Sequence, residues 1–146
     1  MSRRIETEIE IEAPPAVVWK ALAEFSAWPE WNPFIVSFQG EPVIGARIDV
    51  EIQPPGGRRM RFRPVVLVWE PDRALIWKGK LVFAGLFDGE HRFEIESAGE
   101  GRSRFVQAET FSGILVPLFW NSMEESTRAG FKAMNQALKE RVDKGR

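Results

Sequence analysis

The sequence predicts an α+β fold in which a curved antiparallel sheet wraps around one long C-terminal helix. The first segment alternates strictly between apolar and charged residues, as a half-buried strand does. The last segment carries an apolar stripe at helical spacing, and the segments between them are short, alternating and separated by Gly- and Pro-rich turns. A sheet and an amphipathic helix of this kind each have one apolar face, which they can bury against each other.

The long helix is predicted over residues 117–142. Apolar or small residues recur on one side of it, three or four positions apart: Trp120, Met123, Thr127, Gly130, Phe131, Met134 and Leu138. Pro117 suits the first turn, where its missing N–H is not needed. Gly130 lowers the helix propensity, which indicates that another group needs room at that point.

Seven strands and two short helices are predicted before the long helix. Residues 4–12 form the first strand, and Ala13-Pro14-Pro15 ends it. Residues 16–25 follow as a short helix, and Ser26 can cap a second short turn through Glu30. The other strands are predicted over residues 35–38, 46–52, 59–64, 75–83, 87–96 and 102–113.

Three arginines alternate along the strand after the Pro54-Pro55-Gly56-Gly57 turn. Pairing this strand with the preceding one places Glu51 opposite Arg61 and Asp49 opposite Arg63. We therefore interpret Arg59, Arg61 and Arg63 as part of a charge ladder on the outer face, in preference to a phosphate site.

Length and composition exclude several classes of protein. With 146 residues the chain predicts one domain over residues 1–146, and a net charge of −1 does not favour nucleic acid as a partner. Cysteine is absent and there is one histidine, so neither a metal site nor another cofactor is expected. There is no apolar run of about 20 residues for a membrane span and no signal-peptide pattern, so a cytoplasmic location is expected.

Several local strings resemble the SRPBCC superfamily, and within it the bacterial proteins similar to polyketide cyclases and dehydrases. They are IEIEAP at residues 9–14 leading to VVW at 17–19, WPEWNPF at 28–34, GEHRF at 89–93 and ETFSG at 109–113. This resemblance covers essentially the whole chain. It implies the helix-grip fold of START domains and the birch pollen allergen, in a superfamily that includes lipid carriers, hormone receptors, cyclases and chaperone activators.

Two polar residues lie on inward faces that are otherwise apolar. His91 shares its face with Phe93, and Glu109 shares its face with Phe111. If the turn near Glu100 joins these strands in register, His91 lies directly opposite Glu109. The pair could act as a general base with its orienting partner, bind the polar end of a ligand, or simply fix the strand register as a buried pair.

A pocket between sheet and helix is the predicted functional site. The predicted lining comprises Trp31, Asn32, Phe34, Met60, Phe62, Trp77, Phe83, His91, Phe93, Glu109, Phe111, Met123, Thr127, Phe131 and Met134. For Asn32, the alternative is that it only begins a turn.

The expected partner of this pocket is a small or medium-sized hydrophobic molecule: a lipid, a polyketide or an aromatic compound. One alternative function is that of a cyclase or dehydratase acting on a polyketide-like substrate in the same cavity, with His91 and Glu109 as the candidate catalytic residues. Another is that of an interaction module of the chaperone-activator type.

Overall fold

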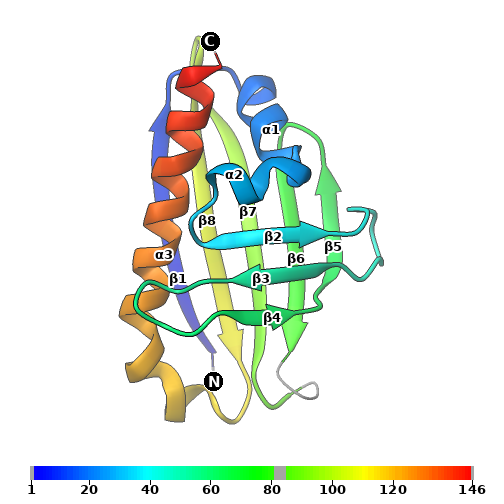
Figure 1. Cartoon of the computed structure of the whole chain (residues 1–146), viewed down its shortest axis with the longest axis vertical. Helices are drawn as coiled ribbons and strands as arrows, with labels where there is room; N and C mark the ends of the chain where they lie inside the picture. Colours follow the sequence, from blue (N-terminus) through cyan, green and yellow to red (C-terminus); the bar gives the residue numbers. More distant parts are fainter. Residues whose placement is uncertain (1, 81–84, 146) are drawn as a thin grey trace.

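A computed structural model describes residues 2–80 and 85–145 and shows the predicted α+β architecture (Figure 1). The helices are α1 (Pro15–Ala23), a 3-10 turn at Phe25–Ala27, α2 (Trp28–Trp31) and the long α3 (Val116–Lys144). The strands are β1 (Ser2–Ile11), β2 (Ile35–Gln39), β3 (Asp49–Ile52), β4 (Met60–Phe62), β5 (Val65–Glu70), β6 (Ala74–Lys80), β7 (Asp88–Gly99) and β8 (Arg102–Ser112).

The strands form two antiparallel sheets that continue into each other. One has the order β1-β8-β7-β6-β5 and the other the order β2-β3-β4. A bridge between Arg47 and Val65 connects them, together with a bond of 2.9 Å from the N–H of Ile48 to the carbonyl of Pro64. Figure 1 shows β2, β3 and β4 crossing the long strands, with α3 running alongside those strands. The sheet therefore curves around the helix, as predicted.

The described residues form eight strands, one more than predicted, because β5 follows the predicted strand over residues 59–64 and was not predicted. Proline has no N–H for a sheet hydrogen bond, so β4 ends at Phe62 and β5 starts at Val65. The predicted charge ladder on the outer face is confirmed. Glu51 lies opposite Arg61, and the Nε of Arg63 is 3.2 Å from the Oδ1 of Asp49.

The stripe on α3 packs against the sheet, and Gly130 gives the closest contact. Phe131, Met134 and Leu138 are fully buried. A Cβ atom at Gly130 would collide with the ring of Phe34, which follows α2. The room that the sequence indicated at Gly130 is thus occupied by an aromatic ring. No helix among the described residues is long and apolar enough to cross a membrane.

Candidate functional site

His91 lies on β7 in the centre of the interior, surrounded by aromatic rings. Its ring centroid is 4.4 Å from that of Phe93, 5.0 Å from that of Phe131 and 5.4 Å from that of Trp77. Only 1% of the residue is exposed. A ligand therefore cannot reach this imidazole in the conformation described, contrary to the expectation that His91 contacts the ligand directly.

Glu109 lies beside His91 on β8, as the predicted register requires. The structure confirms that His91 pairs with Glu109 and Phe93 with Gln107. The Nδ1 of His91 is 3.5 Å from the Oε1 of Glu109, and 18% of the Glu109 side chain is exposed. A Cβ atom at Gly89, the second residue of β7, would collide with the Glu109 carboxyl group, so this glycine leaves the space that the carboxyl group occupies. Of this pair, Glu109 is the member that a ligand can reach.

A chain of hydrogen bonds continues from His91 to the far side of the interior. The Nε2 of His91 is 2.9 Å from the Oε1 of Gln107, and the Nε2 of Gln107 donates to the Oδ1 of Asn135 at 2.8 Å. The Nδ2 of Asn135 donates to the Oγ1 of Thr7 at 2.9 Å. These polar groups on β1, β7, β8 and α3 satisfy one another within an apolar core, as buried polar groups must.

Burial sets the charge of the two titratable groups. It lowers the pKa of His91 to about 4, against a smaller opposing effect of the hydrogen bond that His91 donates to Gln107. Burial also raises the pKa of Glu109 to about 8. A separation of 3.5 Å would also suit an ion pair, but ionising both groups here would require two desolvated charges. We therefore assign a neutral imidazole beside a protonated carboxyl group at neutral pH.

The interior is sealed in one half and incompletely covered in the other. In the sealed half, Trp28, Phe93 and Phe105 are fully buried together with Leu138 on α3. In the other half, inward-facing residues are partly buried or exposed. We call these residues the open end: Ile52, Met60, Phe62, Phe87, Glu109 and Met123.

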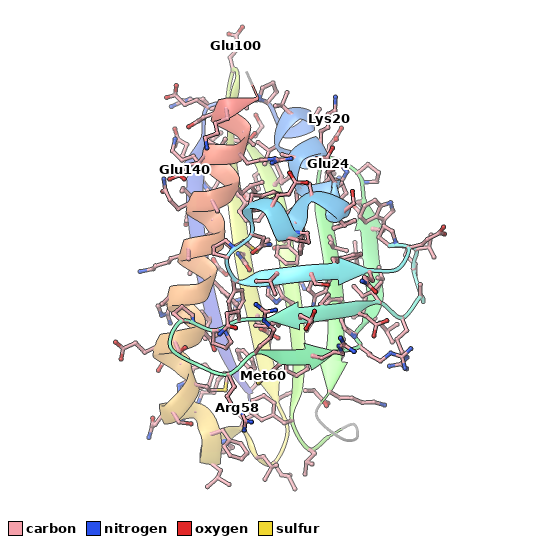
Figure 2. The ribbon with its side chains drawn as sticks, in the orientation of Figure 1. Lys20, Glu24, Arg58, Met60, Glu100 and Glu140 are labelled. Carbon is pink, nitrogen blue, oxygen red and sulfur yellow. The ribbon has the colours of Figure 1, made fainter. Side chains whose placement is uncertain are left out.

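Strand register and packing show that these residues face inward. Phe62 lies opposite the buried Val50, and Met60 lies opposite Ile52 on the same face of the small sheet. Met60 is nevertheless 43% exposed, and Figure 2 shows it in the lower half of the molecule, away from the end marked by Glu100 and Glu140. Phe87, the residue before β7, and Met123 on α3 pack against the core.

The structure divides the predicted lining residues into groups. Trp77, His91, Phe93, Phe111, Phe131 and Met134 are buried in the packed interior. Phe62, Glu109, Met123 and Thr127 are partly buried, and Phe83 lies outside the described residues. Met60 faces the same side as Ile52 but is 43% exposed on the edge strand β4, so it borders the open end and does not line an enclosed wall. The buried residues leave the open end as the place where the predicted pocket could lie.

The segment of Trp31, Asn32 and Phe34 has a mainly structural role. The Oδ1 of Asn32 accepts hydrogen bonds from the N–H groups of Phe34 at 3.0 Å and Ile35 at 2.9 Å, so Asn32 begins a turn. Phe34 packs on Phe131 and Gly130. The Nε1 of Trp31 and the Nδ2 of Asn32 have no hydrogen-bond partner among the described residues.

Sequence reasoning did not identify Thr7, Gln107 and Asn135 as members of the hydrogen-bond chain that begins at His91. Thr7 and Gln107 have inward parity on their strands, and Asn135 lies on the helix side of Phe131 and Leu138. The signal that could have identified them is a polar residue on a face that is otherwise apolar. Two depressions on described residues lie elsewhere, on outer faces of the sheets: one at Ser37, Asp49 and Arg61, and another around Arg73 and Arg92.

Curved sheet, long helix and apolar interior with few polar groups define a helix-grip protein. The chain belongs to the polyketide cyclase/dehydrase and lipid transport family of the SRPBCC superfamily, whose sequence model matches residues 2–143. No curated protein sequence matches the chain.

Solved structures show the same fold. The ZhuI aromatase/cyclase from Streptomyces sp. R1128 is 14% identical, with a TM-score of 0.78 over 98% of this chain and 94% of that one. Norcoclaurine synthase from Thalictrum flavum is 13% identical, with a TM-score of 0.76 over 100% of this chain and 89% of that one. Ara h 8.0201 is 17% identical, with a TM-score of 0.71 over 97% and 98%. At these identities the similarity shows the fold alone.

Proposed function

We propose that the protein binds a small or medium-sized apolar molecule at the open end, with Glu109 as the polar contact. The observation that carries this proposal is a partly exposed carboxyl group of raised pKa among inward-facing apolar side chains that the fold does not cover. Apolar side chains in such a concave position favour an apolar ligand, and one or two polar groups orient it. Family membership supports the same conclusion.

The side chains of the open end suit ligands of variable shape. Met60 lies on β4 and Met123 lies on α3, and methionine adapts to irregular apolar surfaces. Phe62 and Phe87 offer aromatic faces. Since the sealed half is closely packed, the ligand would lie along the first turns of α3.

Saturable binding of N-phenyl-1-naphthylamine, an uncharged apolar fluorophore, tests this proposal. We expect one site per chain, lost or weakened at least tenfold in Met123→Arg, because a charge would then lie in the apolar site. The matched control is Leu67→Arg, since Leu67 is 39% exposed on β5 and should tolerate the charge. Unchanged binding by Met123→Arg, or no saturable binding by the wild type, would contradict the proposal.

The carboxyl–imidazole pair also favours a second candidate, an enzyme of the dehydratase or cyclase type. Loss of water from a β-hydroxy ketone requires a proton for the leaving hydroxyl group and removal of a proton from the neighbouring carbon. Glu109 can supply the first proton and its carboxylate can accept the second, so one group serves both steps. His91 would orient the carboxyl group. Conversion of such a ketone that disappears in Glu109→Gln would support this function, whereas equal rates in both proteins would exclude it.

A further inference from the structure

The hydrogen-bond chain behind His91 is anchored by two backbone carbonyl groups, which can only accept. The Oγ1 of Thr7 donates to the carbonyl of Gln107 at 3.1 Å, and the Nε2 of Gln107 lies 3.4 Å from the carbonyl of Phe131. The single hydroxyl hydrogen of Thr7 is therefore used. Toward Asn135, Thr7 can only accept, so the Nδ2 of Asn135 faces Thr7 and its Oδ1 faces Gln107.

The donor and acceptor roles of Thr7 and Asn135 also determine those of Gln107 and His91. Because the Nε2 of Gln107 is used on Asn135 and Phe131, its Oε1 faces the Nε2 of His91. An amide oxygen cannot donate, so the Nε2 of His91 carries a hydrogen. In a neutral ring the other nitrogen, Nδ1, then presents a lone pair to Glu109.

The lone pair on the Nδ1 of His91 determines how many protons His91 and Glu109 hold together. A carboxylate opposite that lone pair would be repelled, and no described lysine or arginine forms an ion pair with Glu109. Two arrangements avoid the repulsion: a carboxyl O–H facing Nδ1, or a proton moved to Nδ1. Both contain the same number of protons and no net charge. The polar group that a ligand meets is therefore uncharged overall.

We infer that the open end selects ligands whose polar group is an uncharged hydroxyl, over carboxylates and amines. This specificity rests on the proposed binding function. In both arrangements the one carboxyl hydrogen lies between Glu109 and the Nδ1 of His91, so Glu109 offers only acceptor oxygens to a ligand, and a ligand hydroxyl can donate to the oxygen that does not face His91. A ligand carboxylate would find neither a hydrogen-bond donor nor a net positive charge, and an ammonium group would find no net negative charge, so each would lose its hydration without compensation.

Four matched naphthalenes test the selection at pH 6 by calorimetry: 2-naphthol, 2-methylnaphthalene, 2-naphthoate and protonated 2-naphthylmethylamine. We expect the naphthol to bind about tenfold more tightly than the methyl compound, through one uncharged hydrogen bond. Both charged compounds should bind at least tenfold more weakly than the naphthol. A charged compound that binds as well as the naphthol would overturn the inference alone, whereas failure of all four to bind would overturn the binding function.

Glu109→Gln is the diagnostic variant, since it replaces the carboxyl group with an uncharged amide of similar shape. The order of the four compounds should persist in this variant. If the wild type instead preferred the amine and the variant lost that preference, Glu109 would be a carboxylate and the inference would be wrong.

A measurement on the wild type alone avoids any folding defect of the variant. Because the chain has a single histidine, the ¹⁵N spectrum of its imidazole needs no assignment. At pH 6 we expect one protonated nitrogen and one bare nitrogen, with the hydrogen on Nε2. A hydrogen on Nδ1 alone would contradict the donor and acceptor roles assigned along the hydrogen-bond chain, and it would therefore overturn the inference.

Discussion

At the scale of single residues, the His91–Glu109 pair couples the charge of the interior to stability. The pKa of His91 is lowered from 6.5 to about 4, and that of Glu109 is raised from 4.5 to about 8. Between pH 4.5 and 6.5, folding releases a proton from His91 and takes one up on Glu109, so the two effects cancel. Above pH 6.5 only Glu109 contributes, and the native state then binds more protons than the unfolded state.

Stability should therefore fall as the pH rises from 6.5 to 8. At about 1.4 kcal/mol per pH unit, the wild type should lose about 2 kcal/mol relative to Glu109→Gln over this range. Urea denaturation of both proteins at several pH values measures the difference, and the variant serves as the control for all other groups. A constant difference between pH 6.5 and 8 would show that Glu109 is already ionised.

The residue scale also shows where sequence reasoning stops. Alternation predicted that His91 and Glu109 lie opposite each other, because a shift of one residue would turn the apolar face outward. It could not predict that Trp77, Phe93 and Phe131 enclose the imidazole, since enclosure depends on how side chains from three elements fill a common volume.

At the scale of elements, the contact between Gly130 on α3 and Phe34 after α2 fixes how closely the helix approaches the small sheet. Backbone bonding reinforces this position. The N–H of Gln53 donates to the carbonyl of Phe34 at 2.7 Å, and Ser126 on α3 donates to the carbonyl of Pro55 at 3.1 Å. The connection between β3 and β4 is thus attached to the helix and to the segment after α2.

Gly130→Ala should destabilise the protein by about 1–2 kcal/mol. The added methyl group would overpack the contact with Phe34, which outweighs a gain of about 1 kcal/mol in helix propensity. In a Phe34→Leu background the same substitution should be neutral or stabilising. Denaturation of the four proteins gives the coupling, and Ala133→Gly, at an exposed position on α3, calibrates the propensity term. Stabilisation of the wild type by Gly130→Ala would refute the close contact.

The elements were largely predictable, and the exceptions have local causes. The apolar stripe predicted α3, and Gly130 correctly indicated a close neighbour. The strand β5 was not predicted, because residues 65–69 are apolar without the alternation that marked the other strands. Asn135 escaped notice because its partners come from β1 and β8, which are more than 25 residues away in sequence.

At the scale of the whole molecule, the packing of the interior is asymmetric. Trp28, Phe93 and Phe105 close one half, while Met60 and Met123 border the other. Sequence patterns indicated which residues face inward but not how tightly they fill the space, because that depends on the distance between sheet and helix along their length. The cavity between these two elements stays a prediction, and the fully buried side chains limit where it can lie.

This asymmetry predicts how affinity depends on ligand length. In a series of n-alkanols, each added CH₂ should improve affinity about fourfold while it finds apolar surface at the open end, and further groups should add little. Displacement of the fluorescent naphthylamine from the wild type and from the control variant Leu67→Arg measures the series. If affinity instead rises without a plateau up to the longest alkanols, the sealed half must open to accommodate them.

We expect the rings of Trp77, Phe93 and Phe131 around His91 to limit how deeply a ligand enters beneath Glu109. A ligand whose oxygen contacts Glu109 would extend outward from these rings, and the part of a long ligand that exceeds the open end would lie in the surrounding water. That exposed part of the ligand would be accessible to a second macromolecule while its polar end stayed buried. Release could then begin at the exposed part without disruption of the packing between sheet and helix.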